Sequence, residues 1–126
     1  MAEIKAIIDD LGIEAFENSI KIAAIAVLSD LGKIIYQTEN WDLTNQEKII
    51  LDVIKGAQHF IISNVEYSVV EATTEGIIGI NDSGMGHIIF APFQGGVLLA
   101  YAMPQVDPPK ALAFLKTFTS KLKGKV

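Results

Sequence analysis

The chain of 126 residues contains no cysteine. It can therefore form no disulfide, no thiol nucleophile and no thiolate metal site. Histidine is also scarce: the two residues, His59 and His87, have neither the His-x-x-x-His nor the His-Glu-x-x-His spacing. A metal site built on so few imidazoles would need several carboxylates to converge on them. We therefore expect no metal ion and no other cofactor.

Basic residues and long apolar runs are few as well. Ten Lys and Arg face fifteen Asp and Glu, which gives a net charge of −5. Nucleic acids and anionic membranes attract the opposite sign, so we expect neither as a partner. The longest nearly apolar run, residues 22–28, is far short of the ~20 residues of a membrane-spanning helix. Residues 1–5 show no signal-peptide pattern, which predicts a cytoplasmic protein without membrane insertion.

The groups needed for covalent catalysis do not form a recognisable arrangement. Asp82, Ser83 and His87 are close in sequence, but neighbours on a turn do not orient a nucleophile, a base and an acid. Residues 84–86 resemble a phosphate-binding loop, yet no Lys followed by Ser or Thr comes after Gly86. A hairpin turn explains these glycines better. We therefore expect a protein that is not an enzyme and has no catalytic residues.

Half of the residues are apolar, which is enough for one core, and we expect residues 1–126 to form a single domain. Three helices are predicted from apolar spacing and capping residues. The first covers residues 3–11 and is interrupted by Gly12, after which residues 14–18 could add another turn. The second begins with the capping-box pair Thr44 and Glu47 and ends near Gly56, and the third follows Asp107.

Short apolar runs separated by turn residues predict the strands. Six runs have this character: residues 20–28, 33–38, 66–73, 76–81, 86–93 and 97–103. Hairpin-length turns between them favour an antiparallel sheet rather than crossovers. The predicted fold is an α/β (α+β) sandwich around one antiparallel sheet of about five strands. Its order is helix, two strands, helix, three or four strands, helix.

The middle helix is more apolar than one sheet face requires. A helix that is apolar nearly all round is buried on more than one side, and in a chain this short a second subunit could cover that side. The terminal helices are the alternative cover. The predicted homodimer surface combines this helix with the edge of strand 66–73, and consists of Ile49, Ile50, Val53, Ile54, Ala57, Tyr67 and Val69.

Trp41 is the only tryptophan and lies in a loop between a strand and the middle helix. Tryptophan is enriched among residues that dominate binding energy, so Trp41 is a candidate partner-binding residue. It could equally be a lid packed on the core. Both interpretations stay open on the sequence alone.

Three stretches together resemble the roadblock/dynein light chain family: residues 22–36, residues 76–90 and residues 97–102 leading into the Asp107 helix. The resemblance covers about residues 20–122 and is closest to the short archaeal or bacterial single-domain type. It implies a five-stranded sheet with a long helix between the second and third strands. It also implies dimers formed by pairing those helices, and a non-catalytic scaffold that binds or regulates a small Ras-like GTPase.

Two alternatives accompany this interpretation. A profilin-like protein shares the terminal helices on one sheet and has more strands, and this resemblance implies binding of actin and polyproline. A polyproline groove would need converging aromatic residues, for which Phe16, Trp41, Phe114 and Phe118 are the candidates. The other alternative is a small-molecule sensor domain with a pocket near His87, Asp82 and Tyr101.

Overall fold

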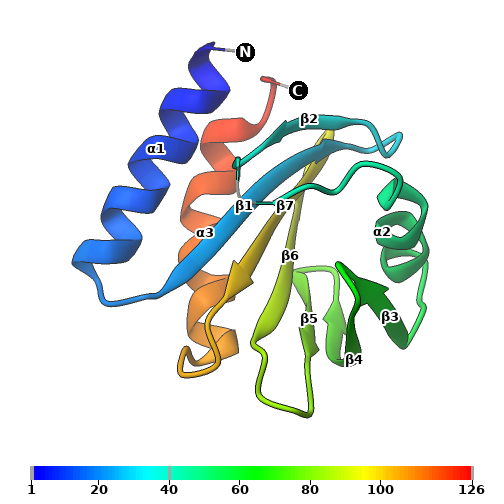
Figure 1. The fold of residues 1–126 in the computed structure, drawn as a ribbon. Helices are drawn as coiled ribbons and strands as arrows, with labels where there is room; N and C mark the ends of the chain where they lie inside the picture. Colours follow the sequence, from blue (N-terminus) through cyan, green and yellow to red (C-terminus); the bar gives the residue numbers. More distant parts are fainter. Residues whose placement is uncertain (1, 40, 126) are drawn as a thin grey trace.

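The protein is one antiparallel sheet with helices on both of its faces (Figure 1). The computed structural model describes residues 2–39 and 41–125. In chain order the elements are α1 (Ala2–Glu17), β1 (Ile22–Ser29), β2 (Ile34–Gln37), α2 (Glu47–Ile54), β3 (His59–Ile62), β4 (Val65–Thr73), β5 (Gly76–Ile80), β6 (His87–Phe93), β7 (Gly96–Ala102) and α3 (Pro108–Leu122).

The sheet has seven strands in the order β2-β1-β7-β6-β5-β4-β3, and every neighbouring pair is antiparallel. Strands β3 to β7 form a meander, and β7 then pairs with β1, far away in sequence. Ile25 lies opposite Ala100 in that pair. The prediction of one antiparallel sheet with three helices is confirmed, and the prediction of about five strands is wrong.

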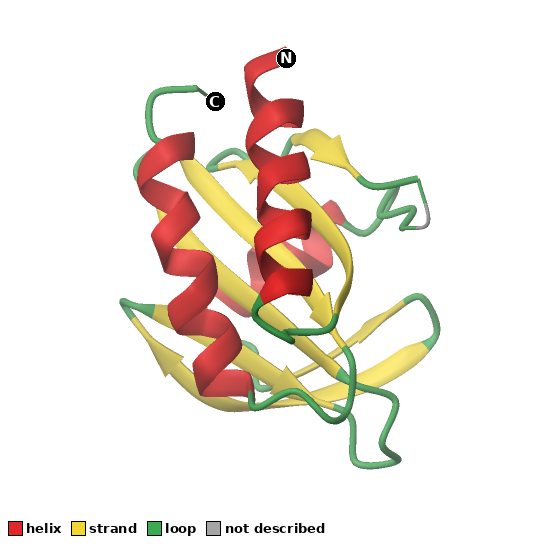
Figure 2. Ribbon diagram, turned by 90° about the vertical axis from the view of Figure 1, so that its left-hand side faces the viewer, coloured by secondary structure: helices red, strands yellow, loops and turns green. Residues whose placement is uncertain are grey.

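Helices α1 and α3 lie side by side on one face of the sheet (Figure 2). The apolar rows of both helices are buried there, with Leu11 on α1 and Phe118 on α3 among the least exposed side chains. Helix α1 continues through Gly12, where the sequence predicts an interruption. Its buried row extends one turn further, from Leu11 to Ala15, so packing on the sheet outweighs the low helix propensity of glycine.

The other face of the sheet is covered by α2 and the loop before it. Ile50 and Val53 of α2 are buried there together with Leu43. The predicted capping box does not form. In a capping box the N–H of Thr44 would donate to the side chain of Glu47, but here it donates to the Asp42 carboxylate at 3.0 Å. The helix begins three residues later, at Glu47, and has no side-chain cap.

The strand that is absent from the six predicted runs is β3. It is four residues long and forms a hairpin with β4 through Ser63 and Asn64, whose φ angles are 53° and 66°. Two successive residues with positive φ are typical of a type I′ hairpin turn. Strand β3 therefore occupies the edge of the sheet beside β4.

Candidate functional site

The end of the sheet formed by β3 and β4 carries apolar side chains that the fold does not bury. Phe60 and Ile62 of β3 point into the core beneath α2, whereas Ile61 between them is 53% exposed. Ile54 on α2 is 43% exposed, and Val70 on β4 is 59% exposed. We call the exposed Ile54, Ile61 and Val70, together with the hollow that Ile61 lines, the edge surface. Exposed apolar side chains at one end of a sheet are candidates for an interaction site.

A hollow of about 330 Å³ lies between α2 and the β3–β4 hairpin. It is lined by Ile49, Asp52, Ala57, His59, Phe60, Ile61 and Glu66. The lining is mostly apolar, and it also includes two carboxylates and one imidazole. An apolar centre with a polar rim is the usual composition of a protein–protein interface.

Strand β4 is irregular where it passes the end of β3. The pairing with β5 shifts between Val69 and Glu71, which leaves Val70 as an extra residue in a β-bulge. Bulges and short edge strands prevent an exposed sheet edge from pairing with another chain. The edge surface is therefore suited to side-chain contacts rather than to extension of the sheet.

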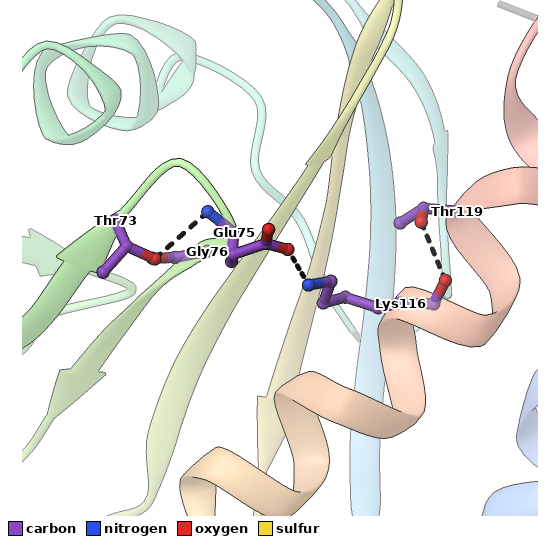
Figure 3. Close-up of polar contacts among 5 residues, drawn as sticks. All are labelled: Thr73, Glu75, Gly76, Lys116 and Thr119. Atoms are coloured by element: carbon purple, nitrogen blue, oxygen red, sulfur yellow. Dashed lines mark hydrogen bonds and ion pairs between the residues drawn. The ribbon is translucent and has the colours of Figure 1, made fainter.

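The β4–β5 turn is held against α3 on the other face of the sheet (Figure 3). Glu75 in the turn forms an ion pair with Lys116 of α3. The hydroxyl of Thr73 accepts a hydrogen bond from the Glu75 N–H at 3.1 Å, which fixes the turn. Gly76 lies directly under Leu112, where a Cβ atom would come within 2.5 Å of the leucine side chain. These contacts fix the orientation of the β4–β5 hairpin relative to α3.

The residues predicted for a homodimer surface lie mostly inside the single chain. Ile50, Val53 and Tyr67 are buried between α2 and the sheet, and Ile49, Ala57 and Val69 pack partly buried against the same cluster. Ile54 is the exception. The apolar character of α2 is thus explained by its own sheet, and β4 is not free to join a partner along residues 65–68, because β3 covers it.

Trp41 is 6% exposed and packs in the core beneath α2, as the lid interpretation requires. With Tyr67 and Tyr101 it lines a cavity of about 230 Å³. Burial raises the pKa of Tyr67 to about 12, and the nearby Tyr101 adds to this effect.

The four candidate aromatic residues for a polyproline groove do not converge. Phe114 and Phe118 touch each other on α3, but Phe118 is buried in the core. Trp41 lies on the opposite face of the sheet, and Phe16 is exposed on α1. The described residues therefore form no groove of the predicted composition.

His87, considered both for catalysis and for a sensor pocket, is hydrogen-bonded to neither Asp82 nor Ser83. His87 is buried, with Nε2 3.2 Å from the carbonyl oxygen of Pro104 and no partner for Nδ1. His87 lies opposite Ala102 in the sheet and Tyr101 lies opposite Ile88, so His87 and Tyr101 point to different faces. These two side chains therefore do not face a common pocket, and the Tyr101 hydroxyl instead donates to the Met85 carbonyl in the β5–β6 turn.

Ser83 is exposed in the β5–β6 turn, where its N–H donates to the Asn81 side chain at 2.9 Å.

Among residues 2–39 and 41–125, no group of three or more His, Asp or Glu side chains could hold a metal ion. No helix in this part of the chain is long and apolar enough to cross a membrane.

Known proteins resemble this chain along nearly its whole length. Loki profilin-2 from Lokiarchaeum sp. is 34% identical and the match covers 95% of both chains, and Loki profilin-1 is 35% identical with the same coverage. The solved complex of Loki profilin-2 with rabbit actin contains a chain that matches with a TM-score of 0.91 at 31% identity, covering 100% of this chain and 99% of that one. No family model matches the chain.

The likeness to roadblock proteins is much weaker. A roadblock/LC7 domain from Streptomyces avermitillis matches with a TM-score of 0.54 at 13% identity, over 90% of this chain and 96% of that one. At this identity the match shows a shared fold and nothing more. The roadblock assignment is therefore wrong, and the expected small GTPase partner has no support. Since the identity to Loki profilins exceeds 30% over nearly the whole chain, the chain belongs to the profilin family.

Proposed function

We propose that this protein binds actin as a non-catalytic, profilin-type regulatory protein in the cytoplasm. The observation that carries the proposal is its similarity to Loki profilin-2, which has been solved in complex with rabbit actin. The similarity has no large gap, since the matched chains cover each other almost completely. A binding function also agrees with a chain in which His87 is hydrogen-bonded to neither Asp82 nor Ser83.

We place the actin contact on the edge surface. Ile61 and Val70 are large apolar side chains exposed on adjacent strands, and Ile61 lines a hollow that could receive a side chain from the partner. Carboxylates of Asp52 and Glu66 lie at the hollow and could pair with basic groups at the rim of an interface.

The proposal is tested by titrating fluorescently labelled rabbit actin monomers with the protein and recording anisotropy. We expect saturable one-to-one binding. Ile61→Lys and Val70→Lys should each weaken it by about tenfold or more, because a buried charge without a partner is costly at an interface. Both side chains are more than half exposed, so the substitutions should leave the fold intact.

Leu31→Lys is the matched control. Leu31 is 87% exposed in the β1–β2 turn, next to the strand at the opposite end of the sheet from β3. This substitution introduces the same charge at another exposed apolar position, and actin binding should be unchanged. Absence of saturable binding by the unmodified protein would refute the function. Equal effects of Leu31→Lys and Ile61→Lys would refute the location.

A further inference from the structure

A second apolar patch lies on α1, on the face of the sheet that α2 does not cover. Phe16 is 85% exposed and Ile13, one turn earlier on the same side of the helix, is 59% exposed. Figure 2 views the molecule from the side on which α1 lies, where the helix ends in the loop that leads to β1. We call Gly12, Ile13 and Phe16 the α1 patch. An apolar ring this exposed gains nothing from the fold of its own chain.

Hollows flank Phe16 on two sides. One of about 510 Å³ extends past Ala15 and Lys21 to Met103, and another of about 700 Å³ extends past Asp9 to Thr38. Gly12, Phe16 and Ile22 line both of them. Phe16 therefore stands between two apolar recesses, which suits a partner that places one apolar side chain on each side of the ring.

Gly12 has no packing reason to be glycine. It lies inside α1, where glycine is less favourable than alanine, and a Cβ atom added to it would meet nothing within 4 Å. Its lack of a side chain leaves bare backbone in the lining of both hollows. Glycine at this position therefore lowers the stability of the helix and leaves the surface beside Phe16 open.

The charges around the α1 patch are mostly negative. Asp9, Asp10, Glu14 and Glu17 are all exposed along the second half of α1, and its last turn has no basic residue. A helix C-terminus favours cations, so Glu14 and Glu17 stand where the helix dipole disfavours them. Lys5 pairs with Asp9 at 2.8 Å, whereas Asp10, Glu14 and Glu17 form no ion pair with a described residue. Of the described residues that line the two hollows, Lys21 alone is basic.

We propose that the α1 patch binds a basic amphipathic helix of a partner protein. Its apolar face would cover Phe16 and fill the flanking hollows, and its cations would meet the carboxylates that α1 leaves unpaired. A second copy of this chain fits less well, because two identical patches would bring the same carboxylates together. The inference does not depend on actin binding, since the α1 patch shares no residue with the edge surface.

Two synthetic peptides test the proposal by isothermal titration calorimetry. One has leucines at helical spacing with lysine at the other positions, and the other replaces each lysine with glutamate. We expect the lysine peptide to bind saturably, and the glutamate peptide at least about tenfold more weakly. Phe16→Ser should lower the affinity for the lysine peptide by about tenfold or more. Leu31→Ser, at an equally exposed apolar residue, should leave its affinity unchanged.

Gly12→Ala separates binding from folding. It should raise the thermal unfolding midpoint by a few degrees, because alanine favours the helix more than glycine does. It should also lower the affinity for the lysine peptide, because the methyl group enters both hollows. Equal affinities for Phe16→Ser and Leu31→Ser, or for the two peptides, would overturn the proposal. A dimer of the unmodified protein that Phe16→Ser dissociates would assign the α1 patch to a second copy instead. Phe16→Ser should still bind actin, so failure here leaves the proposed function untouched.

Discussion

Replacing Ile50 with alanine tests whether α2 belongs to the core of its own chain. Ile50 is fully buried between α2 and the sheet. The substitution removes three carbon groups, worth about 2.4 kcal/mol at ~0.8 kcal/mol each, and the remaining cavity brings the expected loss of unfolding free energy to about 3–4 kcal/mol. Ile54→Ala, on the exposed side of the same helix, should change it by less than about 0.5 kcal/mol.

The assay is urea unfolding followed by tryptophan fluorescence. Trp41 is the only tryptophan and packs in the same core as Ile50, so its signal reports this region. With a slope of about 1–3 kcal/mol per molar urea, a loss of about 3 kcal/mol lowers the midpoint by about 1–3 M. Ile50→Val, with an expected loss of about 1 kcal/mol, provides a measurable variant if the alanine protein does not fold.

Two results would refute this reasoning. Similar losses for Ile50→Ala and Ile54→Ala would mean that burial against the sheet is not what stabilises α2. A midpoint of the unmodified protein that falls on dilution would show that folding is coupled to association, and α2 would then be a subunit interface.

Three further predictions follow from individual contacts. Gly79→Ala should lower the unfolding free energy by about 1–3 kcal/mol in the urea assay, because its Cβ would come within 2.6 Å of the Phe60 ring, and adding Phe60→Leu should restore part of the loss. Glu75→Gln should change stability by less than about 1 kcal/mol, because the ion pair with Lys116 is exposed. Since the pKa of Tyr67 is raised from 10.0 to about 12, the unfolded phenol ionises first and stability should fall as pH rises through that interval. Urea midpoints measured across this range should fall less for Tyr67→Phe.

The parts of the fold that could be predicted are those with strong local signals. The start of α3 is one, since Asp107 occupies the cap position and Pro108 begins the helix. Continuous apolar runs likewise predicted β1 and β5 to β7 nearly to the residue. The continuity of α1 through Gly12 was missed because it depends on packing of Ala15 against the core, which helix propensity does not describe.

The exposed sites could not be predicted, because periodicity gives the apolar face of an element but not what covers it. The stripe on α2 suggested an interface, yet Ile50 and Val53 pack on the sheet. In β3, Phe60 and Ile62 face the core and Ile61 faces the opposite side of the sheet, where no described element buries it. Phe16 was considered only as part of an aromatic groove, and its isolation between two hollows depends on the path of β1 beneath α1.

One short strand accounts for the wrong family and for the expectation that two sheets join edge to edge. Without β3, the sheet has six strands at most, β4 is its edge, and joining two sheets edge to edge is a reasonable expectation. With β3 paired along residues 65–68, that stretch of β4 is covered. The exposed features that remain are side chains, Ile61 and Val70, beside a bulge that disfavours strand pairing. The Ser63-Asn64 turn was the available signal, because two polar residues between apolar runs are typical of a tight hairpin. A surface built on a capped edge favours docking of a differently shaped partner over pairing with an identical chain.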